Sequence, residues 1–160
     1  MKKRYILLAG VNGAGKSTLF QTKSELQNML RINTDEILRQ FGDWRNVDDL
    51  MKAGKIAVRR LNEYLDGGFS FNQETTLCGK SIFRTIEKAR QCGYSIEMHY
   101  VGVDCVEIAK KRVAYRVEHG GHGIPEQYIE RRYIESLENL PRVLRLCDLA
   151  SLYDNTEYFR

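Results

Sequence analysis

Short apolar runs alternate with amphipathic stretches along this chain, and the alternation predicts an order of strands and helices. The runs of strand length lie at residues 4–9, 30–33, 69–73, 94–103 and 149–153. Between them, apolar side chains recur at intervals of three or four, as on helices that pack by one face. Helices are expected over 16–30, from 34, over 47–65, 79–91 and 104–119, and from 125. This order predicts an α/β fold, a three-layer sandwich with helices on both faces of a five-stranded parallel sheet, as one domain over residues 1–160.

Helix-capping residues mark where two of these helices are expected to begin. Thr34 is the candidate cap of the helix that carries Asp35. Asp104 and Glu107 have the spacing of a capping box, so Asp104 is interpreted as a cap and not as a site residue. Gly67-Gly68 is expected to end the helix before the third strand.

A phosphate-binding loop follows the first predicted strand. Residues 10–17 read Gly-Val-Asn-Gly-Ala-Gly-Lys-Ser and fit the pattern G-x-x-x-x-G-K-[ST] at every fixed position. Its glycines let backbone amides approach phosphate oxygens, Lys16 reaches the β- and γ-phosphates, and the Ser17 hydroxyl ligates Mg²⁺. A glycine-rich turn that binds nothing is the alternative, and the flanking strand and helix disfavour it. The predicted nucleotide-binding residues are Gly10, Asn12, Gly13, Ala14, Gly15, Lys16, Ser17 and Thr18.

Composition and charge exclude several classes of protein. The chain is 42% apolar and 29% charged, and no apolar run approaches the roughly 18 residues of a membrane span. The four cysteines form no C-x-x-C pair, which is typical of reduced thiols in the cytoplasm. The basic start at residues 1–4 resembles a leader, but the glycine-rich loop interrupts the apolar run, so a cytoplasmic protein is expected. A net charge of +4, without aromatic residues interleaved among basic ones, does not indicate a nucleic-acid partner.

Polar residues follow the second and third predicted strands, where open parallel sheets bind ligands. Asn33 and Asp35 come after the second strand, and Glu74 and Thr76 after the third. Asp35 is the candidate general base, because a carboxylate near the γ-phosphate can orient an acceptor hydroxyl and take its proton. A first-turn carboxylate that only stabilises its helix is the other interpretation. Glu74 positions the acceptor or holds Mg²⁺ through water, or else is a solvated residue at a strand end.

Arginines cluster in a segment that resembles a small lid, residues 112–132. Arg112 and Arg116 share one predicted helical face, with His119 one step further along. The adjacent Arg131 and Arg132 point about 100° apart on a helix, so one of them faces a given ligand; Arg132 is the candidate, with Arg131 as alternative. Such a lid closes over a nucleotide and places guanidinium groups on the transferring phosphate. A solvated basic face is the other interpretation. His122, among three glycines, either contacts phosphate or serves the turn.

The motifs together resemble the zeta toxin family of P-loop kinases. They are the phosphate loop, Asn33-Thr-Asp35, Glu74-Thr-Thr76, and the segment with Arg112-x-x-x-Arg116, Gly120-Gly-His122, Pro125 and Arg131-Arg-Tyr133, in that order. The resemblance extends from about residue 4 to 155, and the lid motif is its most specific part.

The resemblance implies a five-stranded kinase fold and transfer of the γ-phosphate of ATP or GTP, with Mg²⁺, to a small hydroxyl acceptor. In the toxin members this acceptor is a sugar nucleotide, UDP-N-acetylglucosamine, and a small antitoxin protein is the partner. Asp35 matches the family's base, Arg116 a phosphate-gripping arginine, and Glu74 and Thr76 substrate-contacting positions. Asn33 replaces an acid common in the family. His122 falls near a second arginine of the toxins, so that role passes to Arg131 or Arg132.

Two other functions compete with a small-molecule kinase. A nucleotide-hydrolysing switch or motor would carry an Asn-Lys-x-Asp motif or an apolar run ending in Asp-Glu, and the sequence has neither. A nucleotide-binding module without an acceptor has no need of Lys16, Ser17, Asp35 and Glu74 together.

Overall fold

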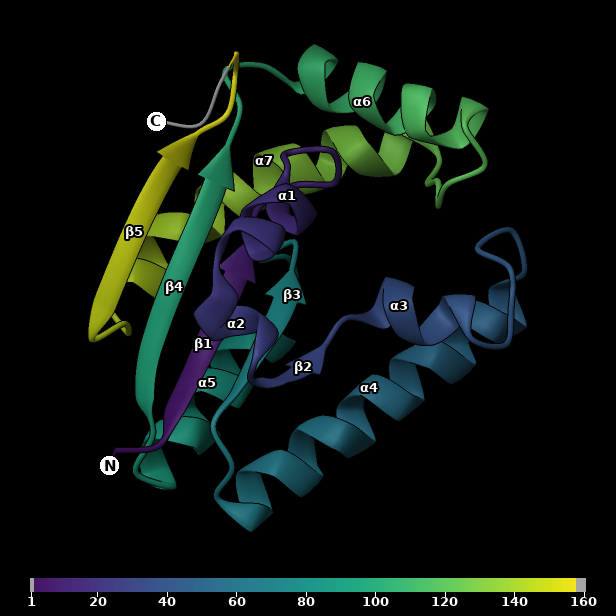
Figure 1. Ribbon diagram of the computed structural model, residues 1–160. Helices are drawn as coiled ribbons and strands as arrows, with labels where there is room; N and C mark the ends of the chain where they lie inside the picture. Colours follow the sequence, from purple (N-terminus) through teal and green to yellow (C-terminus); the bar gives the residue numbers. More distant parts are fainter. Residues whose placement is uncertain (1, 158–160) are drawn as a thin grey trace.

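A parallel sheet of five strands forms the centre of the computed structural model, which describes residues 2–157. The strand order is β2-β3-β1-β4-β5, and every neighbouring pair is parallel (Figure 1). The strands are β1 (Arg4–Ala9), β2 (Leu30–Ile32), β3 (Phe71–Thr75), β4 (Ser95–Gly102) and β5 (Leu149–Asp154). The predicted domain spans 1–160, of which residues 1 and 158–160 lie outside the described part.

The strand order places the ligand-binding end of the sheet between β1 and β3. The chain moves to one side of β1 for β2 and β3 and to the other side for β4 and β5, and open α/β sheets bind ligands at such a reversal. Leu8 pairs with Glu74 and Ala9 with Thr75 in the β1–β3 register. The phosphate loop after β1 therefore lies beside the polar end of β3.

Seven helices among the described residues pack on the sheet, and the α/β three-layer prediction is confirmed. They are α1 (Lys16–Thr22), α2 (Ser24–Gln27), α3 (Thr34–Arg39), α4 (Val47–Gly67), α5 (Ser81–Gln91), α6 (Val106–Glu118) and α7 (Glu126–Leu144). Within residues 2–157, none of these helices has the length and apolar character needed to cross a bilayer.

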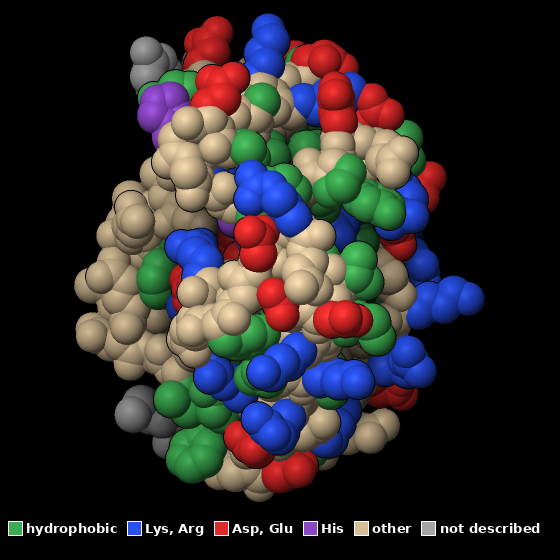
Figure 2. Space-filling model, turned by 90° about the vertical axis from the view of Figure 1, so that its right-hand side faces the viewer, with side chains coloured by type: hydrophobic (Ala, Val, Ile, Leu, Met, Phe, Trp, Pro, Cys, Tyr) green, Lys and Arg blue, Asp and Glu red, His purple; other side chains and the backbone are tan. Residues whose placement is uncertain are grey.

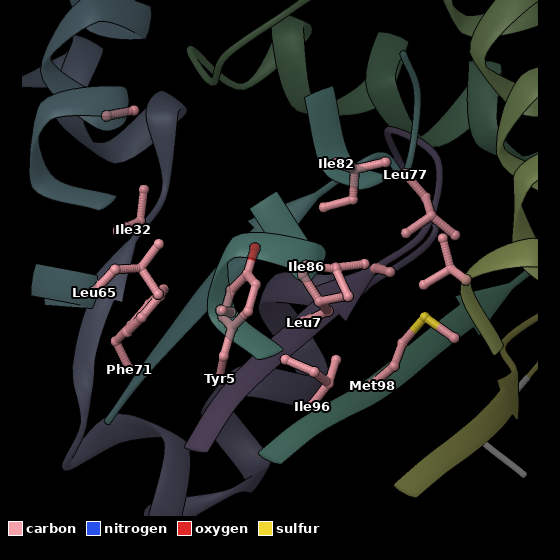
Figure 3. Close-up of a cluster of buried hydrophobic side chains, with 14 of the residues drawn as sticks. Tyr5, Leu7, Ile32, Leu65, Phe71, Leu77, Ile82, Ile86, Ile96 and Met98 are labelled. Atoms are coloured by element: carbon pink, nitrogen blue, oxygen red, sulfur yellow. The ribbon is translucent and has the colours of Figure 1, made fainter. Parts of the chain in front are cut away.

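Two apolar clusters, one on each face of the sheet, form the core. Alternate β1 residues supply both, since successive strand side chains point to opposite faces. On one face Tyr5 and Leu7 pack with α3, α4, α5 and the end of α7, and Figure 3 shows them beside Phe71 and Ile86. On the other face Leu8 packs with the phosphate loop, α1, α6 and the start of α7. The loop and the lid thus share one core.

The expected helix over residues 16–30 is wrong in its length. Lys23 adopts an extended conformation, with φ −112° and ψ 94°, and divides the segment into α1 and α2. Gln27 Nε2 donates to the Gln21 carbonyl at 2.6 Å, which satisfies the end of α1. The fully buried Asn72 amide donates to the carbonyls of Leu26 at 3.0 Å and Leu30 at 3.3 Å. These side-chain bonds replace the helical bonds lost when the chain turns into β2.

Both predicted capping residues are also wrong. The cap of α3 is Asn33, whose side-chain oxygen accepts from the Asp35 and Glu36 amides, and Thr34 is already inside the helix. Cys105 is the cap of α6, which has no side-chain cap bond. Asp104 lies one residue before the cap position. Its amide donates to the Thr156 hydroxyl at 2.9 Å, and its carbonyl accepts from the Tyr133 hydroxyl at 2.9 Å.

Candidate active site

The phosphate loop requires glycine at two positions. Gly10 has φ +145° and Gly13 has φ +81°, values that L side chains rarely adopt. A Cβ atom on Gly10 would lie 2.3 Å from the Val101 carbonyl oxygen, and one on Gly13 would lie 2.5 Å from that of Ala109. The loop therefore rests directly on the backbone of β4 and α6, which fixes its shape.

Lys16 lies buried at the start of α1 and carries the positive charge of the loop. Its Nζ donates to the carbonyls of Gly10 at 2.7 Å and Val11 at 3.1 Å. Burial lowers the pKa of Lys16, and the nearby carboxylates of Glu74 and Asp35 oppose that shift. The structure thus places both predicted acidic site residues within electrostatic reach of the phosphate-loop lysine.

Asp35 occupies the first turn of α3, and Asn33 fixes its backbone. The Asn33 side-chain oxygen accepts from the Asp35 amide at 2.9 Å. The Asp35 carboxylate is 35% exposed, and its Oδ1 lies 3.2 Å from His122 Nε2. A partly exposed carboxylate with one oxygen engaged has the second oxygen available for a ligand hydroxyl.

Glu74 is held at the end of β3 by two donors. Its Oε2 accepts from Arg31 Nη2 at 2.6 Å and from Asn33 Nδ2 at 3.0 Å. Arg31 extends the network, because its Nε donates to Glu36 at 3.0 Å and its Nη1 to Asn72 at 3.0 Å. This network orients Glu74. It also engages both ends of the Asn33 amide within the protein, which gives Asn33 a positioning role in addition to the predicted contact with substrate.

Thr76 lies on a tight turn that follows β3. Leu77 is fully buried at φ +65°, an uncommon conformation for a residue other than glycine. The turn is held because the Leu77 amide donates to the Thr75 hydroxyl at 3.0 Å and Asn139 Nδ2 donates to the Leu77 carbonyl at 2.9 Å. This turn carries Thr76 next to Glu74, in the predicted acceptor region.

Two lid arginines reach the phosphate loop side of the site. Arg116 Nε donates to the His122 carbonyl at 2.6 Å, while its Nη2 is buried without a hydrogen-bond partner among the described residues. Arg132 Nη1 donates to Asn12 Oδ1 at 3.2 Å, and both arginines act electrostatically on Lys16. Arg131 instead lies over the Tyr128 ring, 5.0 Å from its centroid. The structure therefore brings Arg132, and not its neighbour, to the loop.

Arg112 binds backbone carbonyl groups after β5, whereas Arg116 faces the candidate site. Its Nη2 donates to the carbonyls of Asn155 at 2.7 Å and Thr156 at 3.2 Å. Asn155 Nδ2 in turn donates to the Ala14 carbonyl at 2.8 Å. Arg112 therefore fastens the segment after β5 to the phosphate loop.

His119 lies away from the site, contrary to the predicted arginine face. It caps the end of α6, is exposed, and stacks on Tyr115 with ring centroids 4.1 Å apart. A helix that ends at this point cannot continue the face on which Arg116 lies.

The connection between α6 and α7 approaches the connection between α3 and α4 (Figure 1). The Trp44 and His122 rings are 6.1 Å apart, and Gly123 packs so closely on Trp44 that a Cβ would lie 2.7 Å from its ring. Figure 2 shows this side of the molecule, where basic and acidic side chains adjoin a recess. The lid is thus closed against α3 at the position of Asp35.

Comparison with known proteins assigns the chain to a family. The sequence matches the Zeta toxin family over residues 1–158. The chain belongs to the zeta toxin family.

One sequence and two solved structures resemble this zeta toxin family member. An uncharacterized protein of Haemophilus influenzae is 31% identical over 133 residues, 83% of this chain and 94% of that protein. A chain of the PezAT toxin–antitoxin system of Streptococcus pneumoniae superimposes with a TM-score of 0.69 at 18% identity, covering 99% of this chain and 70% of that one. A chain of the AvrRxo1-ORF1:ORF2 complex with ATP gives 0.76 at 13% identity over 96% of this chain and 55% of that one. At these identities the structural likeness establishes the fold.

The protein oxygens of this zeta toxin family member fit a Mg²⁺ ion whose other ligands are substrate phosphates and water. The Ser17 hydroxyl is exposed at the start of α1, next to the loop. Residues 2–157 contain no cluster of three or more His, Cys, Asp or Glu side chains that could hold a metal. Mg²⁺ in phosphoryl-transfer sites keeps several waters and binds substrate phosphates with one or two protein oxygens, so a single hydroxyl donor is compatible with it.

Sequence reasoning missed Arg31 and Trp44. Arg31 is 11% exposed in a three-residue strand, and its partners Asn72 and Glu74 are more than forty positions away in sequence. Trp44 lies in a polar connection with no motif. A signal existed for Arg31, because an arginine between two apolar residues in a short strand is expected to have an acidic partner where its side chain is largely buried.

Proposed function

We propose that this protein is an ATP-dependent kinase that transfers the γ-phosphate to a hydroxyl group of a small molecule. The observation that carries the proposal is the buried Nη2 of Arg116, which has no hydrogen-bond partner within residues 2–157 and lies in the lid beside the phosphate loop and the Asp35–His122 contact. A buried guanidinium nitrogen without a partner is unfavourable, and a phosphate oxygen would satisfy it.

The chain's own residues divide the reaction between two sides of the site. On the nucleotide side, the loop amides and Lys16 bind the β- and γ-phosphates, and Arg116 and Arg132 stabilise charge on the transferring group. Ser17 would hold Mg²⁺, which would neutralise negative charge on the phosphates. Closure of the lid excludes water, which favours the acceptor over hydrolysis.

On the acceptor side, Asp35 takes the proton of the attacking hydroxyl as its oxygen bonds the γ-phosphorus. The bond from that phosphorus to the β–γ bridging oxygen breaks, and ADP leaves with that oxygen. Glu74, fixed by Arg31 and Asn33, has its Oε1 available to accept a second hydroxyl or amide hydrogen of the acceptor. Two carboxylates facing one site favour a polyhydroxylated acceptor.

The family favours a sugar nucleotide, UDP-N-acetylglucosamine, as the first acceptor to test. Kinship with a chain of a toxin–antitoxin system likewise supports an inhibitory protein partner. Growth arrest on expression of the wild-type chain but not of Asp35→Ala would support that partner, and equal growth would count against it.

Transfer of labelled γ-phosphate from ATP to a panel of acceptors tests the kinase proposal. The panel holds UDP-N-acetylglucosamine, other sugar nucleotides, nucleosides and small sugars, with Lys16→Ala and Asp35→Ala as inactive controls. We expect one labelled product, reduced by about 10²-fold or more in each variant, because each removes a group used at the reacting phosphate. Steady phosphate release that is equal in wild type and Asp35→Ala, with no labelled product, would instead indicate a nucleotide hydrolase.

A further inference from the structure

Of the three histidines, His122 is the one that lies against the candidate base, and its ring is largely buried. Its side chain is 9% exposed, and its Nε2 lies 3.2 Å from Asp35 Oδ1. Within residues 2–157 no side-chain hydrogen bond to the Asp35 carboxylate is found, so the close approach of the His122 ring is the polar side-chain contact that can set its orientation.

The backbone of the lid fixes the ring from the other side. Arg116 Nε donates to the His122 carbonyl at 2.6 Å. A Cβ on Gly121 would lie 2.4 Å from Arg116 Cγ, and one on Gly123 would lie 2.6 Å from Val117 Cγ2 and 2.7 Å from the Trp44 ring. Glycines on both sides of His122 therefore let the connection between α6 and α7 pack tightly, which fixes the backbone from which the ring reaches Asp35.

We propose that His122 is a positioning residue for Asp35, holding one carboxylate oxygen so that the other faces the acceptor hydroxyl. The inference rests on the proposed function, because a base needs an acceptor. It differs from the expectation that His122 contacts phosphate. Arg116 joins the two halves of the site, since its Nε holds the His122 backbone while its Nη2 remains for a phosphate oxygen. Lid closure over the nucleotide thus also orients the base.

The charge state of the ring follows from its surroundings. Burial lowers the pKa of His122, Asp35 opposes that shift, and Arg116, Arg39 and Arg132 reinforce it. These groups come from α3, α6 and α7, and on the Trp44 side the Arg45 guanidinium lies over the indole ring, 4.4 Å from its centroid. At neutral pH the ring is therefore neutral, and in the proposed role it carries its proton on Nε2, the nitrogen 3.2 Å from Asp35 Oδ1. As the pH falls through this pKa, the imidazolium forms an ion pair with Asp35 and weakens it as a base, so kcat decreases on the acid side.

Nuclear magnetic resonance of the histidine rings tests the pair without any assay of activity. The chain has three histidines, so His99 and His119 serve as internal references. We expect His122 to be the Nε2–H tautomer at neutral pH and to titrate below the ordinary pKa of about 6.5. In Asp35→Asn the pKa of His122 should fall further, because the carboxylate that favours the charged ring is gone, while the pKa of His99 stays unchanged. An unchanged His122 titration in Asp35→Asn, or an Nδ1–H tautomer, would overturn the proposal.

Steady-state kinetics then distinguish a role of His122 in positioning Asp35 from a role in binding substrate. His122→Ala should lower kcat by about 10- to 100-fold, with KM for ATP and acceptor changed less than about threefold. His122→Gln keeps an N–H donor that does not titrate, so it should restore much of kcat and flatten the acid limb of the pH profile. His119→Ala, in the same connection but outside the site, is the matched control.

Three outcomes count against the role of His122 and one against the kinase itself. A raised KM with unchanged kcat in His122→Ala would make the residue a ligand for phosphate or acceptor. Failure of His122→Gln to differ from His122→Ala in kcat and pH profile would remove the hydrogen bond as the cause. Transfer to no acceptor, with a His122 titration that shifts in Asp35→Asn, would reject the proposed function, whereas an unshifted His122 titration in an active kinase rejects only the positioning role.

Discussion

Three arginines of the lid have different partners although they carry the same charge. Arg112 donates to backbone carbonyls at the end of the sheet, Arg132 donates to Asn12 in the phosphate loop, and Arg116 keeps one buried nitrogen unpartnered within the described chain. The first arrangement is structural and the other two are suited to an incoming anion. At the scale of the residue, what each nitrogen already bonds decides whether the arginine can bind a ligand.

The adjacent pair on α7 provides a matched test of this distinction. Arg132→Ala should lower kcat by about 10²- to 10³-fold, since a guanidinium near the transferring phosphate acts mainly on the transition state. Arg131→Ala should leave kcat within about twofold, because its guanidinium lies over Tyr128. Phosphoryl-transfer kinetics on both purified variants check this, and equal losses would contradict the assignment of Arg132 to the loop.

The sequence reveals residues whose role depends on local spacing and conceals those whose role depends on distant partners. The phosphate loop is a contiguous motif, so Lys16 could be recognised from eight letters. Asp35 could be placed because it directly follows a strand. The role of Arg31 depends on Glu74 and Asn72, which reach it only through pairing of β2 with β3. Helical spacing likewise put Arg112 and Arg116 on one face, but it does not specify what that face meets.

At the scale of elements, the lid is joined to the rest of the site by close packing as well as by hydrogen bonds. The α6–α7 connection touches the α3–α4 connection at Gly123, where Val117 and Trp44 leave no room for a side chain. Strand positions were predicted well because apolar runs persist in a buried parallel sheet. The break of the first helix at Lys23 was not predicted, because the bonds that compensate for it come from Gln27 and from Asn72 in β3.

Two glycine-to-alanine changes test the packing of the lid. Gly123→Ala should decrease the free energy of unfolding by about 1–3 kcal/mol, because the added methyl group overlaps Val117 and Trp44. Gly54→Ala, inside α4 with nothing within 4 Å of its added Cβ, should increase it by about 0.5–1 kcal/mol through helix propensity. Denaturant titration measures both changes. A Gly123→Ala protein as stable as wild type would show that Val117 and Trp44 can move to accommodate the added methyl group.

At the scale of the whole molecule, acids and bases are interspersed over the surface, and the net charge of +4 is small. On the face in Figure 2, Lys and Arg side chains gather toward the lower part with Asp and Glu among them. Each exposed ion pair on such a surface contributes little to the free energy of unfolding. The pH dependence of folding should therefore come from a few groups with displaced pKa values.

Histidine burial predicts that stability decreases in mildly acidic solution. Burial lowers the pKa values of both His99 and His122 in the folded chain. Their unfolded forms bind protons more tightly, so the free energy of unfolding should fall as pH drops below about 6.5 and level off below the folded pKa values. Carboxylates with a lowered pKa, such as Asp148, which accepts from the Ile96 amide, act in a separate window at lower pH.

Urea unfolding between pH 7.5 and 5 measures this effect. His99→Gln should show a smaller loss of stability across that range than the wild type. His119→Gln, which changes an exposed ring, should follow the wild type. A wild-type chain equally stable at both ends of the range would mean that neither buried ring remains neutral.

The position of Trp44 has an optical consequence. It is the single tryptophan of the chain, and its ring adjoins His122 and Gly123 where the lid meets the α3–α4 connection. Intrinsic fluorescence excited at the indole band therefore comes from one ring at the contact between the lid and the α3–α4 connection. Any opening of that contact on nucleotide binding can be followed in stopped flow on the unlabelled, unmodified chain, without knowledge of which acceptor it uses.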